Sequence, residues 1–264
     1  MRIALGLEYD GGPFHGWQSQ ADGGGVQDAL ERALAAIANA RIGTVAAGRT
    51  DAGVHATLQV VHFDTEAARP DTAWVRGVNS HLPGDIAVRW AQPVPAEFHA
   101  RFAASARHYT YLLASSATRP ALLAGRAGWY HRPLDVGAMR EAAAALAGTH
   151  DFSAFRAAEC QAASPVKTLS PVGIAAAGEC IRFDFSANAF LHHMIRNIVG
   201  ALVYVGAGKA PVAWIAELVA ARDRTRAAPT FAAAGLYLTG ADYDAKWGLP
   251  PTRRPVAFPF AGEV

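Results

Sequence analysis

The stretch AGRTDAGVHA, residues 47–56, connects two apolar runs that are typical of β-strands, residues 42–47 and 58–63. Two glycines flank its single carboxylate, Asp51, and allow the backbone to turn sharply and to approach another group closely. Loops carried by a rigid sheet are a frequent place for catalytic and binding residues. The sequence therefore predicts two strands joined by a loop that presents Asp51.

The same loop carries basic side chains, Arg49 and His55. One acid between two basic groups favours a chemical role. A charged surface turn is the alternative, because Asp and Gly are ordinary turn residues. The residues of the loop alone leave both interpretations open.

The length and composition limit the number of domains and the classes of protein to consider. The 264 residues allow one large domain or two modest ones, and 52% hydrophobic with 17% charged residues argues against wholesale disorder. The net charge of +2, from 24 Lys and Arg against 22 Asp and Glu, is too balanced to indicate a nucleic-acid partner by itself. Such a partner would require basic residues gathered on one face. Arg far exceeds Lys, which suits phosphate and base contacts or reflects genome composition.

The sequence carries no pattern typical of a secreted protein, a membrane helix or a metal site. The sequence shows no charged and then apolar leader of a secreted protein. We therefore expect Cys160 and Cys180 to be reduced thiols in a cytoplasmic protein. No apolar run reaches the roughly 18 residues of a membrane helix, so we expect no membrane partner. His192 and His193 are adjacent and cannot share one helix face, so we expect no metal site.

The N-terminal part, residues 1–104, has the pattern β-α-β-β-α-β. The predicted strands are 2–9, 42–48, 58–65 and 86–90, and the predicted helices are an amphipathic one at 26–37 and a short one at 71–79 with Asp71 as N-cap. This order predicts a split ferredoxin-like sheet with its helices on one face.

The second part, residues 105–248, repeats an alternation of strands and helices. We predict strands at 105–114, 168–176, 180–185 and 235–239, and helices at 134–146, 190–205 and 211–220. A Pro-rich tail, 249–264, is expected along the surface. The predicted class is α+β, with two ferredoxin-like halves.

Residues 47–56 resemble the active-site signature of the tRNA pseudouridine synthase A family. Further segments resemble the same family in the same order: residues 5–11, 16–18, Asn79 with 82–88, 98–102 and 190–200. The resemblance covers residues 2–242, and several long ordered matches are far more specific than one short motif.

The resemblance implies a pseudouridine-synthase-type antiparallel sheet with a central cleft. It also implies an isomerase, an intramolecular transferase, that converts uridine to pseudouridine in the tRNA anticodon stem-loop, at positions 38, 39 and 40 in tRNA numbering. Neither metal nor cofactor is implied, and the expected assembly is a homodimer that binds tRNA.

By resemblance, Asp51 is the catalytic aspartate and Tyr109 the tyrosine that holds the uracil. Arg196 is expected to pair with Asp51, and Arg49 to contact phosphate. The alternatives are a phosphate contact or surface position for Arg196 and core packing for Tyr109. Tyr111 lies on the same strand face and is easily mistaken for Tyr109.

Other polar residues are weaker candidates. Seven residues either support the site or contact RNA: His55, Arg101, Arg107, His108, His192, His193 and Asn197. The alternative for each is a solvated surface position or a hydrogen-bonded position in the core. Gln18 and Asn79 either bind RNA or close loops, and Asp10 and Asp85 fit structural turns. Two competing functions are an RNA-binding module without catalysis and a nucleotide enzyme with a phosphate loop. The second lacks the required Gly-Lys-Ser/Thr.

Overall fold

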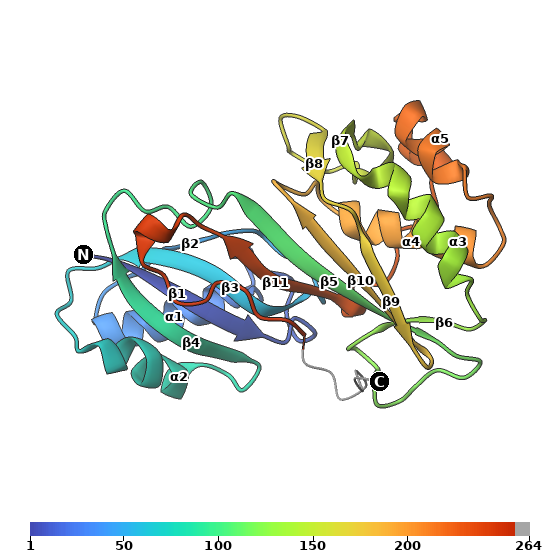
Figure 1. Ribbon diagram of the computed structural model, residues 1–264. Coiled ribbons are helices and arrows are strands. Elements are labelled where there is room, and N and C mark those ends of the chain that lie inside the picture. The colour runs from blue at the N-terminus through green and yellow to red at the C-terminus, as the bar shows by residue number, and fades with distance from the viewer. Residues whose placement is uncertain (257–264) are drawn as a thin grey trace. The chain divides into compact units, whose positions relative to one another are not determined.

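The computed structural model describes residues 1–256 (Figure 1). The chain forms two compact units. The first unit comprises Met1–Arg107 and Tyr237–Val256, and the second comprises His108–Leu236. The predicted ranges 1–104 and 105–248 differ from these units chiefly because the last strand belongs with the N-terminal segment. Residues 257–264 of the predicted tail lie outside the described residues.

The first unit is built on a mostly antiparallel sheet. Its strands are β1 (Arg2–Tyr9), β2 (Thr44–Ala46), β3 (His55–Asp64), β4 (Ile86–Val94) and β11 (Leu236–Asp242). The order is β4-β1-β3-β11, and β2 pairs with the second half of β3. β1 runs antiparallel to both of its neighbours, whereas β11 runs parallel to β3.

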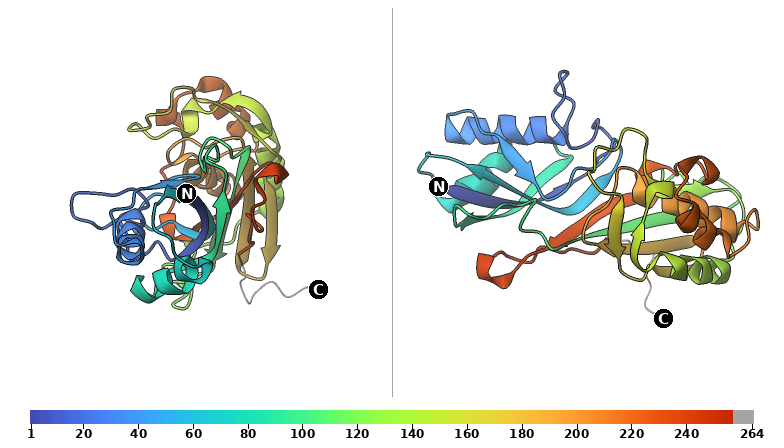
Figure 2. Two further views of the ribbon diagram at one scale, coloured as in Figure 1. Left: turned by 90° about the vertical axis from the view of Figure 1, so that its left-hand side faces the viewer. Right: turned by 90° about the horizontal axis from the view of Figure 1, so that it is seen from above.

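Two helical segments cover one face of this sheet (Figures 1 and 2). The helix α1 spans Val26–Ala38, and a π-helical turn, Ala73–Gly77, leads into α2 at Val78–His81. The predicted order β-α-β-β-α-β is confirmed. The apolar spacing of α1 places its aliphatic side chains in the core, and each large one contributes about 1.5–3 kcal/mol. The expectation that Asp71 caps the second helix is wrong, because Asp71 is already helical.

The second unit contains the strand order β5-β10-β8-β7. The strands are β5 (Ala106–Ser115), β6 (Gly128–Tyr130), β7 (Gly148–Asp151), β8 (Val166–Leu169), β9 (Gly173–Ala177) and β10 (Cys180–Ala187). β9 and β10 form a hairpin, and β6 runs parallel to β5. The α+β class with mostly antiparallel strands is therefore confirmed.

One predicted strand is wrong. Residues 168–176 cover the end of β8 and most of β9, and residues 170–172 separate the two strands. Pro171 lies in this break, and proline has no backbone N–H to donate to a sheet. The short strands β6 and β7 were not predicted, because three or four residues give too little alternation.

The helices of the second unit gather on one face of its strands (Figure 2). They are α3 (Val136–Ala143), α4 (Met194–Gly206) and α5 (Trp214–Ala221). Short 3₁₀ helices occur at Ala144–Leu146, Ser153–Phe155, Arg224–Arg226 and Ala233–Gly235, and in the first unit at Ala245–Trp247. The predicted start of α4 at residue 190 is wrong. His193, with φ 61°, adopts the left-handed conformation and delays the helix to Met194.

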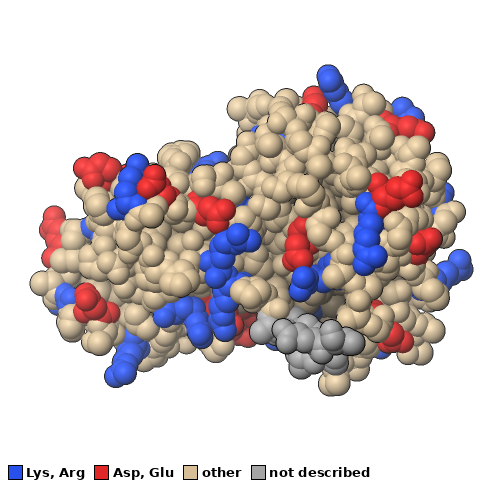
Figure 3. Space-filling view, in the orientation of Figure 1, with Lys and Arg blue, Asp and Glu red and all other residues tan. Residues whose placement is uncertain are grey.

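The surface carries charges of both signs. On the face drawn in Figure 3, Lys and Arg side chains are interspersed with Asp and Glu side chains. Glu8, for example, pairs with Arg254 and lies 3.6 Å from Arg89. Within residues 1–256, no helix has both the length and the apolar character that crossing a membrane requires.

His62 is a buried polar group in the first unit. It lies on β3 with 4% of its surface exposed, and its Nδ1 accepts the Ala100 N–H at 3.1 Å. Burial, followed by the charge of Arg2, lowers the pKa of His62 to about 4, below its ordinary value of 6.5. The imidazole is therefore neutral in the folded protein, as its role as an acceptor requires.

This burial predicts an acid-sensitive fold. The unfolded chain takes up a proton at His62 near pH 6.5, whereas the folded protein does so only near pH 4. The stability that the neutral, buried His62 contributes is therefore complete above pH 6.5 and is lost as the pH falls toward 4. The free energy of unfolding should decrease by about 2 kcal/mol between pH 7.5 and pH 5 through this group. In urea unfolding, the free energy of unfolding of His62→Gln should fall by about 2 kcal/mol less than that of the wild type over this pH range. The exposed control His81→Gln should behave like the wild type, and an unchanged slope in His62→Gln would contradict the assignment.

Candidate active site

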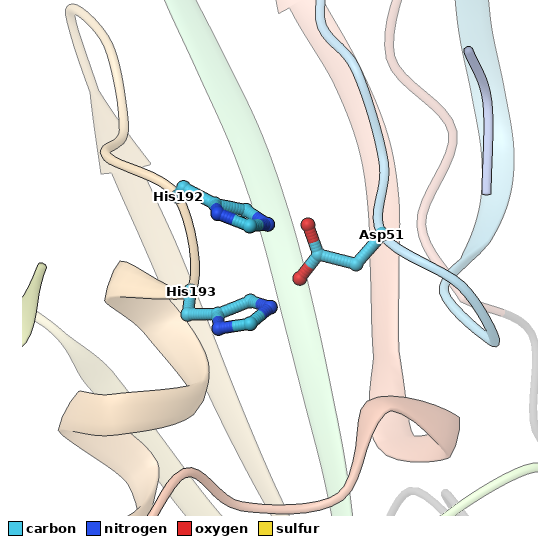
Figure 4. A group of neighbouring side chains, drawn as sticks. All are labelled: Asp51, His192 and His193. Carbon is cyan, nitrogen blue, oxygen red and sulfur yellow. The ribbon is translucent and has the colours of Figure 1, made fainter. Parts of the chain in front are cut away.

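The predicted turn at Asp51 is present. The Val54 N–H donates to the Asp51 carbonyl at 3.1 Å, and Gly53 has φ +75°, a conformation that favours glycine. Figure 4 shows the Asp51 side chain on the connection that leads into β3. The side chain is half-buried, and the adjacent Ala52 is exposed. The carboxylate is thus carried at the apex of a tight turn on the sheet.

The residue before Asp51 is held by two hydrogen bonds. The Trp17 N–H donates to the Thr50 carbonyl, and the Tyr9 hydroxyl lies 2.9 Å from Thr50 Oγ1 in a buried contact. Burial raises the pKa of Tyr9 to about 12, so the phenol stays protonated at neutral pH. Gly16, with φ +94°, lies so close to Thr50 that a Cβ at this position would be 2.8 Å from the Thr50 carbonyl oxygen. The backbone that carries Asp51 is therefore fixed from β1 and from the loop after it.

His55 fixes the other end of the turn. The residue is 1% exposed, and its Nδ1 lies 2.8 Å from Asp10 Oδ1 and 3.1 Å from the Gly11 backbone nitrogen. Its ring stacks on Tyr237 with centroids 4.7 Å apart. Gly11 has no space for a side chain, since a Cβ would lie 1.9 Å from the Val54 carbonyl oxygen. Within the first unit, His55 and Asp10 therefore join the turn to the end of β1.

The start of the loop is also tied to the sheet. Gln59, buried on β3, donates to the Gly48 carbonyl, and Arg107 donates to the Ala47 carbonyl at 3.1 Å. Arg49 is exposed. The loop is thus anchored through its backbone. Tyr9, Thr50 and Gln59 were missed as positioning residues, although a Gln inside the apolar run of β3 is a usable signal.

Among the other polar candidates of the first unit, Asn79 and Asp10 hold backbone groups and Gln18 bonds a side chain. The Asn79 amide bonds both the N–H and the carbonyl of Val88, at 2.7 and 2.9 Å. Gln18 donates to Gln27 at 3.3 Å, and Asp10 Oδ1 accepts the Gly12 N–H at 2.9 Å. The structural interpretation of Asn79 and Asp10 therefore agrees with these contacts.

The structure separates the two tyrosines of β5. Tyr111 is fully buried, and its hydroxyl donates to the Ala232 carbonyl at 2.7 Å. It also fills the space beside Gly235, where a Cβ would lie 2.6 Å from its ring, so it belongs to the core. Tyr109 is 8% exposed and meets the ring of Phe190 edge to face at 5.2 Å. Of the two, Tyr109 is the candidate for substrate contact.

Arg196 lies in the first turn of α4 and is half-buried. Its Nε donates to the Phe231 carbonyl at 2.9 Å, and the Phe231 N–H donates to the Arg196 carbonyl at 3.2 Å. The neighbouring segment runs against the helix at Gly200, where a Cβ would lie 2.4 Å from the Pro229 carbonyl oxygen. One edge of the guanidinium is therefore oriented by backbone before any substrate binds.

The residues around Arg196 have separate roles. Asn197 is fully buried. It donates to the Phe155 carbonyl at 2.8 Å and accepts from Thr230 and Arg224, which makes it a structural junction. His192 and His193 precede α4 in Figure 4, with ring centroids 4.0 Å apart. The sequence-predicted site residues are thus divided, with Asp51 and Arg49 in the first unit and Tyr109 and Arg196 in the second.

Comparison with known proteins gives long matches. A sequence profile described as tRNA pseudouridine synthase matches residues 7–103 and 142–244, which include Asp51 and Arg196, while Tyr109 lies between the two ranges. A protein of Thiobacillus denitrificans named tRNA pseudouridine synthase A is 60% identical over 261 residues, 99% of this chain and 100% of the relative. Relatives with the same name from Dechloromonas aromatica and Chromobacterium violaceum are 60% and 61% identical. The first covers 95% of both chains, and the second covers 95% of this chain and 96% of its own.

Proposed function

The chain belongs to the tRNA pseudouridine synthase family, and we propose on this basis that it is an isomerase that converts uridine to pseudouridine in tRNA. The observation that carries the proposal is 60% identity to a tRNA pseudouridine synthase A over 99% of the chain. The anchored carboxylate of Asp51 supports it, because a chemical step needs a reacting group in a fixed place.

The reaction requires one bond to break and another to form at the same ribose carbon. The N-glycosidic bond of uridine is cleaved, the base turns, and the ribose is joined to a carbon of the base. That carbon loses a proton, and the ring nitrogen that was released from the ribose gains one. We assign Asp51 to this chemistry, either by attack on the sugar or by a role at the base. Product and substrate contain the same atoms, so the balance calls for no second substrate and no redox cofactor.

We assign Arg196 a supporting role. A reacting carboxylate must stay ionised when water is excluded, and desolvation alone would favour its protonated form. A guanidinium supplies a positive charge that does not titrate, and it can bind both oxygens of a carboxylate in one planar fork. The hydrogen bond from its Nε to the Phe231 carbonyl supports this assignment, since the side chain is already oriented.

Tyr109 and Arg49 are assigned to substrate binding. The Tyr109 ring is suited to stacking on uracil, and its phenol could also move a proton at the base. Unchanged turnover in Tyr109→Phe would exclude the proton-transfer role and leave stacking intact. Arg49 is exposed beside Asp51 and suits a phosphate of the reacting nucleotide.

The finer assignments follow the family resemblance. We propose the anticodon stem-loop as target, at positions 38, 39 and 40, a homodimer as the active assembly and the cytoplasm as its location. An enzyme that modifies several adjacent positions is expected to bind phosphates and shape more than base sequence.

The central test uses tRNA whose uridines carry tritium at C5, because joining the ribose to that carbon releases the label. The wild type should release tritium, and Asp51→Asn should lower the rate by more than about a thousandfold while it still binds tRNA. Asp85→Asn, a turn aspartate of the same unit, is the matched control and should stay active. If the wild type binds tRNA but releases no tritium, the protein is an RNA-binding module and the proposal is wrong.

Arg196 should matter for turnover more than for affinity. Arg196→Ala should reduce the rate at saturating tRNA by about a hundredfold or more, with tRNA affinity changed less than about threefold, because the lost charge acts in the reaction. Arg196→Lys keeps the charge without the planar fork, so its rate should lie between those of the wild type and Arg196→Ala. Equal losses of rate and affinity in Arg196→Ala would identify a phosphate contact instead.

A further inference from the structure

Phe102 is an exposed aromatic side chain on a loop of the first unit. It is 76% exposed, in a segment that follows β4 and precedes β5. A single exposed apolar residue is common on proteins and needs no special explanation. The surroundings of Phe102 are what make this residue a candidate for binding.

The ring of Phe102 is held in place on one side. The His99 ring stacks on it with centroids 4.3 Å apart and an angle of 25° between the planes. His99 Nδ1 also accepts the N–H groups of Arg101 and Phe102, both at 3.2 Å. His99 therefore supports one face of the ring and fixes the backbone that carries it.

The loop itself is anchored to the core of the unit. Arg2 donates to the Phe98 carbonyl at 2.8 Å, and Tyr243 donates to the Ala100 carbonyl at 2.6 Å. The Ala100 N–H donates to His62, and Arg107 donates to the Arg101 carbonyl. These bonds order the loop before any partner arrives, so its exposed ring pays little entropy on binding.

Arg101 adds a positive charge beside the ring. Its guanidinium carbon lies 5.7 Å from the centroid of Phe102, and the side chain is exposed. An aromatic face next to an arginine suits a nucleobase and its phosphate, because the base stacks on the ring and the cation attracts the backbone.

We propose that Phe102 and Arg101 form a platform on which an unpaired tRNA nucleotide, other than the reacting uridine, stacks. This inference rests on the proposed function, since it assumes tRNA as the substrate. A protein partner fits less well. One ring is far smaller than the surface that a stable protein interface buries, and the adjacent cation favours a polyanion.

The test measures tRNA affinity at one fixed salt concentration for three substitutions of Phe102. Phe102→Ala and Phe102→Leu should each weaken binding about tenfold or more, because both remove the flat ring. Phe102→Tyr should bind within about twofold of the wild type. The rate of tritium release at saturating tRNA should change little in all three. The control is Leu122→Ala, which should bind normally; Leu122 is an apolar residue of the second unit that is 91% exposed.

The outcomes separate this inference from the proposed function. If Phe102→Leu or Phe102→Ala binds tRNA like the wild type, while the wild type releases tritium, the platform is wrong and the enzyme assignment stands. If Phe102→Ala instead changes the mass of the assembly in light scattering, the ring contacts a second copy of the chain. That result would also overturn the proposal.

Discussion

The position of Asp51 depends on the hydrogen bonds that hold its neighbour Thr50. One is made by the Trp17 N–H to the Thr50 carbonyl, and the other joins the Tyr9 hydroxyl to Thr50 Oγ1. Both partners are buried at 2% exposure. A hydrogen bond in such surroundings is costly to break, since the unpaired groups would find no water. The turn that presents the carboxylate is therefore tied to β1 and to the loop that follows it.

Buried polar side chains serve the same purpose elsewhere in each unit. In the first unit Gln59 and His62, both on β3, bond backbone groups of two different loops. In the second unit Asn197 joins α4 to the Phe155 carbonyl and to Thr230. Polar groups at such positions cost free energy unless they are paired, so their pairing fixes the loops to the core. In the first unit these bonds hold the backbone at Gly48 and Ala100 against β3.

Much of the fold could be predicted from local pattern. The 3.6-residue spacing identified α1, and the alternation of residues 108–111 supported the strand β5. The predictions failed where one residue overrode the pattern: Pro171 divides a strand, and His193 in the left-handed conformation delays α4. Neither event changes the apolar character of its segment, so periodicity could not reveal it.

The candidate site was found through resemblance more than through physical pattern. Residue types on β5 could not separate Tyr109 from Tyr111. The resemblance favoured Tyr109. The hydrogen bond from the Tyr111 hydroxyl to the Ala232 carbonyl, more than a hundred residues away in the chain, places Tyr111 in the core. Asn197 looked like a possible RNA contact until its three partners were seen. Such roles depend on long-range contacts, which a single sequence does not encode in its local spacing.

The central claim is that the Asp51 turn is rigid before tRNA binds, and amide hydrogen exchange of the free protein tests it most directly. The Trp17 and Val54 N–H groups, which donate to Thr50 and Asp51, should exchange at least about a hundredfold more slowly than in an unstructured peptide. Exchange of both amides at near-peptide rates, while Leu5 on β1 stays protected, would contradict the account.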